Sequence, residues 1–380
     1  MHDGPVVVVA GGGTGGHLYP ALAIADALRA RRPDVRVLFI GARRGLEARV
    51  LPARGEWHVL LPVRGATRSL AAVRAVPSIV LSFLRVATLL ARVRPEVVVV
   101  TGGYAAAPAG FVAALGGVPL VLQEQNSVPG KVTRVLSRWA SRAYVAFPEV
   151  LQLLPALRDR ALVTGNPVRT AEGLPRAEAR ARFGIPMDAR LLLVAGGSQG
   201  SLAINEVLAD AVSAVARGEL ARPRDLHVLW VTGPAHAGAV GEALAAAGSP
   251  DWVHPVPYVD DFPSALRAAD LAVSRAGAMS TAELLLHGLP VVLVPLPTAA
   301  ADHQTHNARA LERAGAALVA PQNGLTGERL WAAVSGLLAS PARLETMRQA
   351  ALAWARPNAA ADIAADIATL LTPPAGGGAR

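Results

Sequence analysis

Short runs of apolar residues alternate along this chain with longer stretches in which apolar residues recur every three or four positions. The short runs have the length and composition of buried parallel strands, and the longer stretches have the periodicity of helices that cover a sheet. The predicted strands are 6–10, 35–40, 97–100, 120–122, 191–195, 226–231, 271–273 and 291–294. Because strands alternate with helices, we expect an α/β fold with doubly wound parallel sheets.

One opening motif occurs twice, about 185 residues apart: an apolar strand, a glycine turn and a helix. The motif begins at Val6, with the turn GGGTGG at Gly11–Gly16, and again at Leu191, with the turn GGSQGS at Gly196–Ser201. Such a turn exposes backbone N–H groups at a helix N-terminus, where they favour an anion such as a phosphate. The repeat therefore predicts two Rossmann-like domains.

The turn-forming sequence Gly165–Asn166–Pro167 follows an apolar run and is the predicted domain boundary. We expect a first domain at 1–164 and a second at 165–345. A C-terminal helix at about 350–371 is expected to pack back on the first domain. Residues 372–380, rich in Gly and Pro, are expected to be disordered.

Residues 75–91 are the one stretch that is comparable with a membrane span. The stretch has only 17 residues and contains Arg85, so it is at the lower limit of what crosses a bilayer. A helical projection places Ile79, Phe83, Val86 and Leu90 on one face, and Ser78, Ser82, Arg85 and Arg92 on another. We therefore expect an amphipathic helix rather than a span.

Composition changes this picture in two ways. Hydrophobic residues make up 52% of the chain, which excludes wholesale disorder, and the absence of cysteine excludes disulfides and thiolate metal sites. Residues Met1–Val9 do not have a basic segment followed by an apolar one, so we expect no secretory signal and a cytoplasmic location.

The charge is distributed unevenly between the two halves. Residues 1–164 carry 20 Arg and Lys against 9 Asp and Glu, a net charge of +11, whereas residues 165–380 have a net charge of −2. A basic half predicts an anionic partner, such as a membrane surface, a phosphate-bearing substrate or nucleic acid. Only 4% of residues are aromatic and no basic stretch has interleaved aromatics for base stacking, so we expect no nucleic acid.

Polar residues follow three predicted strands of the first half. His17 comes directly after the first glycine turn, Gly102–Tyr104 follows the strand 97–100, and Gln123–Asn126 follows the strand 120–122. The carboxyl ends of parallel strands meet at one edge of a sheet, where ligands bind in doubly wound folds. These residues are candidates for a single site.

An NADP-dependent oxidoreductase is an alternative, because the first turn also fits G-x-G-x-x-G. The second strand continues Gly41-Ala42-Arg43-Arg44 without the acid that binds a ribose, although the arginine pair would suit a 2′-phosphate. A single dinucleotide fold leaves the second glycine turn unexplained, which argues against this alternative.

The second half contains two further clusters. The small residues of Ser274–Glu283 (SRAGAMSTAE) allow close approach of a ligand, and Glu283 is suited to accept both hydroxyls of a ribose. Asp302–Asn307 (DHQTHN) offers groups for sugar hydroxyls, and Arg169 at the boundary is suited to a phosphate. No H-x-x-H, H-E-x-x-H or D-x-D spacing predicts a metal site.

The motifs GGGTGGH, GGY, QEQN, GNPVR, GGSQGS, RAGAMSTAE and DHQTHNA, in this order, closely resemble the MurG family. Members of that family are peripheral membrane transferases that add N-acetylglucosamine to lipid I in peptidoglycan synthesis. The match runs from about Val6 to about Ile367. The resemblance implies a GT-B fold whose two domains face a central cleft, with UDP-GlcNAc as donor and lipid I as acceptor. It also implies inverting chemistry without metal or cofactor, at the cytoplasmic face of the plasma membrane.

The resemblance also implies roles for particular residues. On the donor side it indicates Arg169, Ser198, Val259, Ala278, Met279, Ser280, Thr281, Ala282, Glu283 and Gln304. Among these, Glu283 would bind the ribose, Gln304 the sugar, and Ser198 with Arg169 the diphosphate. From the first domain, Thr14, Gly15, Gly16 and Asn126 would line the cleft, and His17, Gly103, Tyr104 and Glu124 would face the acceptor.

The acceptor hydroxyl requires a general base. His17 is the candidate that the sequence favours, and Glu124 is the alternative. Many family members have His where this chain has Gln123, which argues against an essential imidazole at that position.

Two other functions remain open at this point. A UDP-N-acetylglucosamine 2-epimerase has the same fold and donor but needs no lipid, and a non-catalytic nucleotide-sugar-binding module would also have the glycine turns. The basic amphipathic helix and Gly102–Tyr104 favour the transferase. On this view Ile79, Phe83, Leu84 and Arg85 contact an anionic membrane surface.

Overall fold

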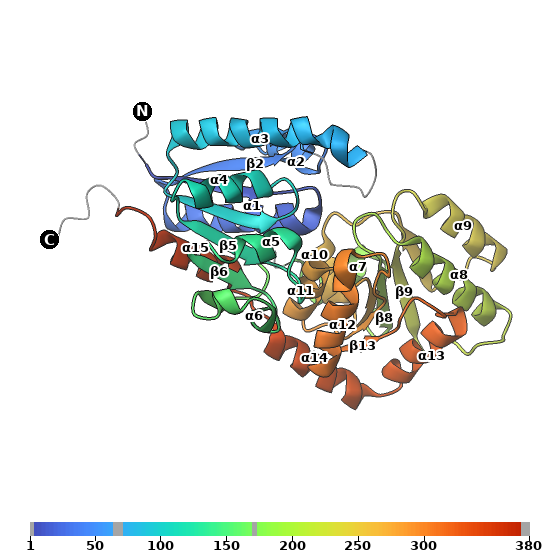
Figure 1. The fold of residues 1–380 in the computed structure, drawn as a ribbon. Coiled ribbons are helices and arrows are strands. Elements are labelled where there is room, and N and C mark those ends of the chain that lie inside the picture. Colours follow the sequence, from blue (N-terminus) through green and yellow to red (C-terminus); the bar gives the residue numbers. More distant parts are fainter. Residues whose placement is uncertain (1–3, 64–70, 169–172, 374–380) are drawn as a thin grey trace. The chain divides into compact units, whose positions relative to one another are not determined.

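The computed structural model describes residues 4–63, 71–168 and 173–373, without the side chains of 71–76. The chain divides into two compact units. The first comprises Met1–Arg169 and Arg356–Arg380, and the second comprises Thr170–Ala355. Each unit contains one parallel sheet flanked by helices (Figure 1).

The sheet of the first unit has seven strands in the order β3-β2-β1-β4-β5-β6-β7. The strands are β1 (Val6–Gly11), β2 (Arg36–Ala42), β3 (His58–Leu61), β4 (Val97–Gly102), β5 (Leu120–Glu124), β6 (Arg142–Val145) and β7 (Ala161–Val163). All neighbouring strands pair in parallel. The strand order reverses between β1 and β4, which makes their carboxyl ends the expected ligand position.

The helices of the first unit are α1 (Gly15–Arg31), α2 (Glu47–Ala53), α3 (Ala71–Val93), α4 (Ala107–Leu115), α5 (Lys131–Leu136), α6 (Val150–Leu153) and α15 (Ala359–Ala368), with the 3-10 turn η1 (Pro155–Leu157). Helix α1 begins at Gly15, four residues before the helical periodicity becomes visible at Tyr19. The last two glycines of the turn therefore lie in the first turn of the helix.

The C-terminal helix packs on the first unit. Ile363 and Ile367 of α15 are fully buried in one core cluster with Val7 and Val9 of β1, and the Tyr144 hydroxyl of β6 donates to Asp366 at 2.7 Å. The single helix expected at about 350–371 is in fact two, α14 (Pro341–Trp354) in the second unit and α15 in the first. Pro357 lies in the break, where its missing N–H cannot continue a helix.

The sheet of the second unit has six parallel strands in the order β10-β9-β8-β11-β12-β13. The strands are β8 (Arg190–Ala195), β9 (Leu226–Val231), β10 (Val253–Val256), β11 (Leu271–Ser274), β12 (Val291–Leu293) and β13 (Ala317–Val319). The helices are α7 (Arg176–Arg182), α8 (Leu202–Ala216), α9 (Ala237–Ala246), α10 (Phe262–Ala268), α11 (Ala278–Leu286), α12 (His303–Arg313), α13 (Gly327–Leu338) and α14, with the 3-10 turn η2 (Ala300–Asp302).

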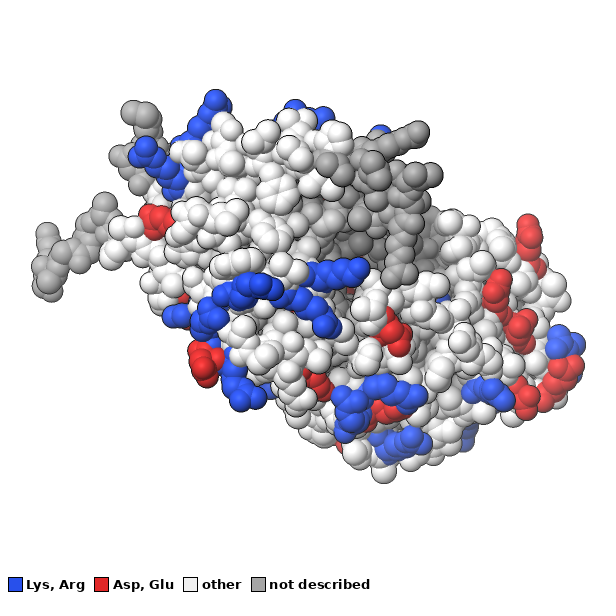
Figure 2. Space-filling model, viewed as in Figure 1, with Lys and Arg blue, Asp and Glu red and all other residues white. Residues whose placement is uncertain are grey.

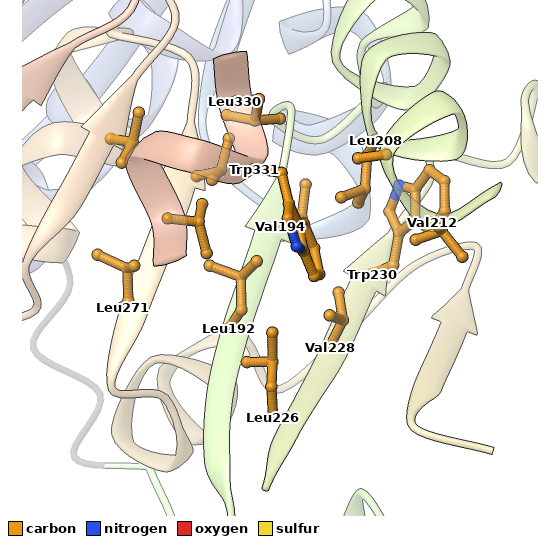
Figure 3. Close-up of a cluster of buried hydrophobic side chains, with 14 of the residues drawn as sticks. Leu192, Val194, Leu208, Val212, Leu226, Val228, Trp230, Leu271, Leu330 and Trp331 are labelled. Carbon is orange, nitrogen blue, oxygen red and sulfur yellow. The ribbon is translucent and has the colours of Figure 1, made fainter. Parts of the chain in front are cut away.

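The core of the second unit lies between its sheet and helices α8 and α13 (Figure 3). Trp230 of β9 is fully buried, and its indole N–H donates to Asn205 of α8 at 2.9 Å. The Asn205 amide in turn donates to the Thr232 carbonyl at 2.8 Å. A buried indole needs such a partner, so this pair fixes α8, the helix that follows the second glycine turn, to the sheet.

The eight predicted strands are all present, but five further strands are not apparent from the sequence pattern: β3, β6, β7, β10 and β13. Four of these are sheet edges and β6 lies next to an edge. Edge strands are exposed on one side, so they do not need the continuous apolar run by which a central strand is found.

Helix α3 corrects one part of the predicted amphipathic pattern. Ser82, which the projection placed on the polar face, is fully buried, and its hydroxyl donates to the Ser78 carbonyl at 2.6 Å. Val86 and Leu90, which the projection placed on the apolar face, are buried, and Leu84 is 61% exposed. Among the described residues, no helix is long and apolar enough to cross a bilayer.

Candidate functional site

A buried carboxylate holds the first glycine turn. Gly13 has a φ of 93°, and its N–H donates to both oxygens of Glu47, at 2.9 and 3.0 Å. The same carboxylate accepts from the N–H of Ala42 at 2.7 Å, and Glu47 is fully buried. A carboxylate that accepts several backbone N–H groups is well satisfied despite its burial.

Glu47 was missed by the sequence reasoning, which found no acid directly after the second strand. It lies five residues beyond the end of β2, in the first turn of α2, and binds the turn itself. Glu47 could have been found as the first acidic residue after Arg43–Arg44. The consequence is that Gly13, which we expected to offer its N–H to an anion, is already bonded to a protein carboxylate. The remaining candidates for anion contact are Gly15 and Gly16, because first-turn amides have no carbonyl within the helix.

Tyr104 lies against the same turn. Its ring Cε1 is 2.9 Å from the position that a Cβ on Gly13 would take, so only glycine fits there. Burial raises the pKa of the Tyr104 hydroxyl, and the Glu47 carboxylate adds to this. The phenol therefore stays neutral and acts as a hydrogen-bonding group beside the turn.

His17 is held by the end of β4 and the residues after β5. Its Nδ1 lies 3.0 Å from the Thr101 carbonyl oxygen and 3.0 Å from Oε1 of Gln125. The Thr101 hydroxyl donates to the His17 carbonyl at 2.8 Å. A Cβ on Gly102 would lie 2.9 Å from Nδ1, so the backbone at the end of β4 can approach the imidazole closely only because this residue is glycine.

Glu124, the alternative base, accepts hydrogen bonds from the loop that follows it. The side chain is 4% exposed, and its two oxygens accept from the N–H of Gly130 at 3.0 Å and of Asn126 at 3.2 Å. The Asn126 amide adds a contact to the same carboxylate at 3.5 Å. This carboxylate holds the loop between β5 and α5.

The second glycine turn approaches the neighbouring strand β9. A Cβ on Gly200 would lie 2.1 Å from the Thr232 carbonyl oxygen, so the close approach requires glycine. Ser201 caps α8 by accepting the N–H of Ile204 at 3.4 Å. Ser198 is exposed on the turn, at the N-terminal side of a 15-residue helix whose dipole favours an anion.

Helix α11 carries the predicted ribose-binding residues. Burial raises the pKa of the Glu283 carboxyl to about 7. The Thr281 hydroxyl is buried and contacts the carbonyls of Gly277 and Ala278 as a donor, each at 3.0 Å. It therefore hydrogen-bonds to the first turn of α11. Met279, Ser280 and Ala282 are half-buried, whereas Ala278 is buried.

Gln304 is the second residue of α12. Its Oε1 accepts from the N–H of Leu296 at 3.0 Å. Ala301 and Asp302, directly before α12, both have a φ of 52°, a left-handed conformation that costs free energy in residues other than glycine. The strained segment thus lies next to the residue predicted to hold the sugar.

Two buried polar side chains that the sequence reasoning did not single out support these loops. The Arg275 guanidinium donates to the carbonyls of Val294 and Pro295 at 3.2 and 3.3 Å, and burial lowers its pKa. The fully buried Asn307 donates to the Ala276 carbonyl at 3.2 Å. Arg275 belongs to the motif RAGAMSTAE and Asn307 to DHQTHNA, so their place in these motifs was the sequence feature that could have identified them.

The structure brings most predicted residues to the carboxyl edge of their own sheet. In the first unit, His17, Tyr104 and Glu124 belong to the ends of β1, β4 and β5, which are neighbours. In the second unit, Ser198, the start of α11 and Gln304 follow the neighbouring strands β8, β11 and β12. The buried Val259 follows β10, two strands away from β8. Arg169 lies outside the described residues.

A second surface of the first unit combines apolar and basic side chains. Phe83 of α3 packs on Phe111 of α4, and Phe111 packs on Trp139 after α5, each with ring centroids 6.1 Å apart. The exposed apolar residues around this row are Val80, Leu81, Leu84, Leu115, Val135 and Trp139, and the exposed basic ones are Arg85, Lys131, Arg134 and Arg138. We call these residues the α3–α5 surface.

Figure 2 shows basic side chains gathered over the region of α5 and β6, and a surface with few charged side chains over α3 and α4. Of the predicted membrane contacts, Leu84 and Arg85 are exposed, whereas Ile79 and Phe83 are half-buried. Among the residues that the structure describes, no group of three or more His, Asp or Glu is placed to hold a metal ion.

Comparison with known proteins agrees with the two-unit architecture. The N-terminal domain model of glycosyltransferase family 28 matches residues 7–145, and the C-terminal domain model of the same family matches residues 191–367. Together with two Rossmann-like sheets, each opened by a glycine turn, these matches define a GT-B glycosyltransferase.

Similar proteins and a similar solved structure identify the family more specifically. Proteins named UDP-N-acetylglucosamine--N-acetylmuramyl-(pentapeptide) pyrophosphoryl-undecaprenol N-acetylglucosamine transferase are 44% identical in Salinibacter ruber and 40% identical in Desulfitobacterium hafniense. They cover 96% and 93% of this chain, which in turn spans 97% and 96% of theirs. The crystal structure of Acinetobacter baumannii MurG has a TM-score of 0.74 at 27% identity, covering 97% of this chain and all of that one. The chain belongs to the MurG family.

Replacement of the turn-holding carboxylate should loosen the first glycine turn. We expect Glu47→Ala to lower the free energy of unfolding by about 2–4 kcal/mol, because buried N–H groups lose a charged acceptor. Hydrogen exchange at the Gly13 amide should also accelerate. Glu242→Ala, which removes an exposed helical carboxylate, is the control and should change neither quantity. Unchanged exchange at Gly13 in the Glu47 variant would contradict this account of the turn.

Proposed function

We propose that this chain transfers N-acetylglucosamine from UDP-GlcNAc to the 4-hydroxyl of the muramoyl sugar of lipid I, giving lipid II and UDP. The observation that carries the proposal is the placement of the predicted residues at the carboxyl edges of the two sheets, in a chain whose relatives are named for this reaction. Those names also weigh against a 2-epimerase and a binding module.

The second unit is the proposed donor site. Glu283 accepts the ribose hydroxyls, Gln304 contacts the sugar, and the backbone near Val259 or Met279 contacts the base. The N-terminus of α8 and the turn around Ser198 stabilise the diphosphate as negative charge develops on it in the transition state. In this proposal helix dipoles and loop amides stabilise the negative charge of the leaving UDP, without a metal or cofactor.

The first unit is the proposed acceptor site. The reaction breaks the bond between C1 and the phosphate oxygen and forms a bond between C1 and O4 of the acceptor, with inversion to a β-1,4 linkage. The O4 proton passes to a general base. His17 is the better candidate, because both oxygens of Glu124 already accept from loop N–H groups.

The decisive assay measures UDP release from UDP-GlcNAc with and without a soluble lipid I analogue. We expect release only with the acceptor, and one disaccharide product for each UDP. Conversion of UDP-GlcNAc to its C2 epimer without net release of UDP would support the epimerase instead. Donor binding with neither UDP release nor an epimerised product would support a binding module.

Glu283 makes donor binding depend on pH. Burial raises its pKa to about 7, so the free carboxyl is protonated at pH 6 and ionised at pH 8. Because the ionised form accepts two hydroxyls, the apparent KM for UDP-GlcNAc should fall as the pH rises through 7. Glu283→Ala should raise this KM about tenfold to hundredfold, from a loss of about 1.5–3 kcal/mol. Its KM should also become flat with pH, whereas Glu242→Ala should keep the wild-type profile. A wild-type KM that does not change between pH 6 and 8 would contradict the role of Glu283.

We further propose that the α3–α5 surface binds the anionic cytoplasmic face of the plasma membrane, where a lipid-linked acceptor is anchored. The exposed apolar residues of α3, α4 and the α5 segment insert among headgroups, and the neighbouring basic residues attract anionic lipid. The net charge of +11 in residues 1–164 supports the same assignment.

Vesicle co-sedimentation tests this surface. Arg85→Glu/Arg138→Glu should weaken binding to anionic vesicles at low salt at least about tenfold, because each basic residue near the surface contributes about 1 kcal/mol. Leu81→Ser/Leu84→Ser should weaken binding at both low and high salt. Met187→Ser, which removes an exposed apolar side chain from the second unit, is the control. If both double variants fold and sediment as well as the wild type, this surface is not the membrane contact.

A further inference from the structure

The side chain of Gln125 contacts the candidate base His17 and is almost fully buried, with 2% of its surface exposed. Its orientation is determined by its surroundings. Nε2 lies 2.6 Å from the Thr101 carbonyl oxygen and 3.2 Å from the Gln123 carbonyl oxygen, and it also contacts Oε1 of Gln123. An amide oxygen in that position would face three other oxygens. Nε2 must therefore be there, and Oε1 must face His17.

This orientation determines which nitrogen of His17 carries the proton. Nδ1 lies 3.0 Å from two oxygens, Oε1 of Gln125 and the Thr101 carbonyl, and neither of these has a hydrogen to donate. Both contacts are satisfied only if Nδ1 carries the hydrogen. In the neutral ring the lone pair then belongs to Nε2, the nitrogen that is free to accept a proton.

The amide of Gln125 is itself held by further amides. Gln123 is 1% exposed, accepts from Gln125 and donates to Oδ1 of Asn166 at 3.4 Å. Asn166 donates back to the Gln125 carbonyl at 3.1 Å. All three side chains are neutral. Nδ1 therefore donates to an amide oxygen and a backbone carbonyl, and no carboxylate is among these partners.

We infer that Gln125 is a positioning residue, which fixes His17 as the Nδ1–H tautomer and so makes Nε2 the atom that receives the acceptor proton. The catalytic part of this inference rests on the proposed transferase function, whereas the tautomer does not. Sequence reasoning placed Gln125 in a polar cluster without a role, and for Gln123 it noted only that many family members have His at that position. In this geometry Gln125 orients His17, and Gln123 holds Gln125.

The tautomer is measured first in the intact wild-type protein. Protein with ¹⁵N-labelled histidine should give, in long-range ¹H–¹⁵N spectra above pH 8, a His17 signal of the Nδ1–H form, assigned by its loss in His17→Gln. A wild-type signal of the Nε2–H form would overturn the inference, whether or not any variant folds.

Gln125→Met then tests the positioning. It keeps the length of the side chain but removes the acceptor, so the His17 signal should shift toward a mixture of tautomers. The kcat for UDP release with the lipid I analogue should fall about tenfold to hundredfold, part of the 10²–10⁴ that a general base contributes, with the donor KM unchanged. Gln152→Met, which replaces an exposed amide on α6, is the control and should resemble the wild type.

The outcomes separate this inference from the proposed function. A folded Gln125→Met with wild-type tautomer and wild-type kcat would overturn the inference and leave the transferase assignment intact. A wild-type protein that shows the Nδ1–H tautomer but never releases UDP would instead contradict the proposed function.

Discussion

Parallel pairing of β1 with β4, and of β8 with β11, is the constraint on which the site depends. Because every paired strand in both sheets runs in the same direction, each connection that follows a strand emerges at the same edge. Residues as distant in sequence as His17, Thr101 and Gln125 are thereby brought within hydrogen-bonding distance. The second sheet repeats the arrangement with the turn after β8, the start of α11 and the segment before α12.

Three buried or half-buried glutamates at these edges have different surroundings. Glu47 and Glu124 accept hydrogen bonds from backbone N–H groups of the loops they hold. For Glu283 the cause of the pKa shift is burial, which raises the pKa to about 7. A carboxylate satisfied by its own loop maintains structure, whereas one destabilised by burial gains most when a ligand supplies donors. This contrast separates the proposed ligand-binding acid from the other two.

The two units share an architecture but differ in their outer surfaces. The first has the α3–α5 surface, where a row of aromatic rings lies among exposed apolar and basic side chains. Arg138 stacks on Trp139 at 5.1 Å, which keeps a cation beside the apolar ring. The second unit has nearly balanced charge. The proposed division of labour, in which one unit meets a lipid-linked acceptor and the other a soluble donor, agrees with this difference.

The sequence by itself determined the α/β class, the central strands, the two glycine turns and the motifs that mark the family. These features are local: a buried parallel strand needs a continuous apolar run, and a tight turn needs glycine at particular positions. The edge strands were not predictable, since a strand such as β10 (VHPV) needs no such run, and β6 (RAYV), which lies next to an edge, is short and lacks one. Only the tertiary structure decided that Glu47 bonds to Gly13, that Ser82 is buried and that Gln125 orients His17. Each of these depends on contacts between residues that are separated along the chain or by a helix turn, and burial and hydrogen-bond partners are set only when the strands have been brought together.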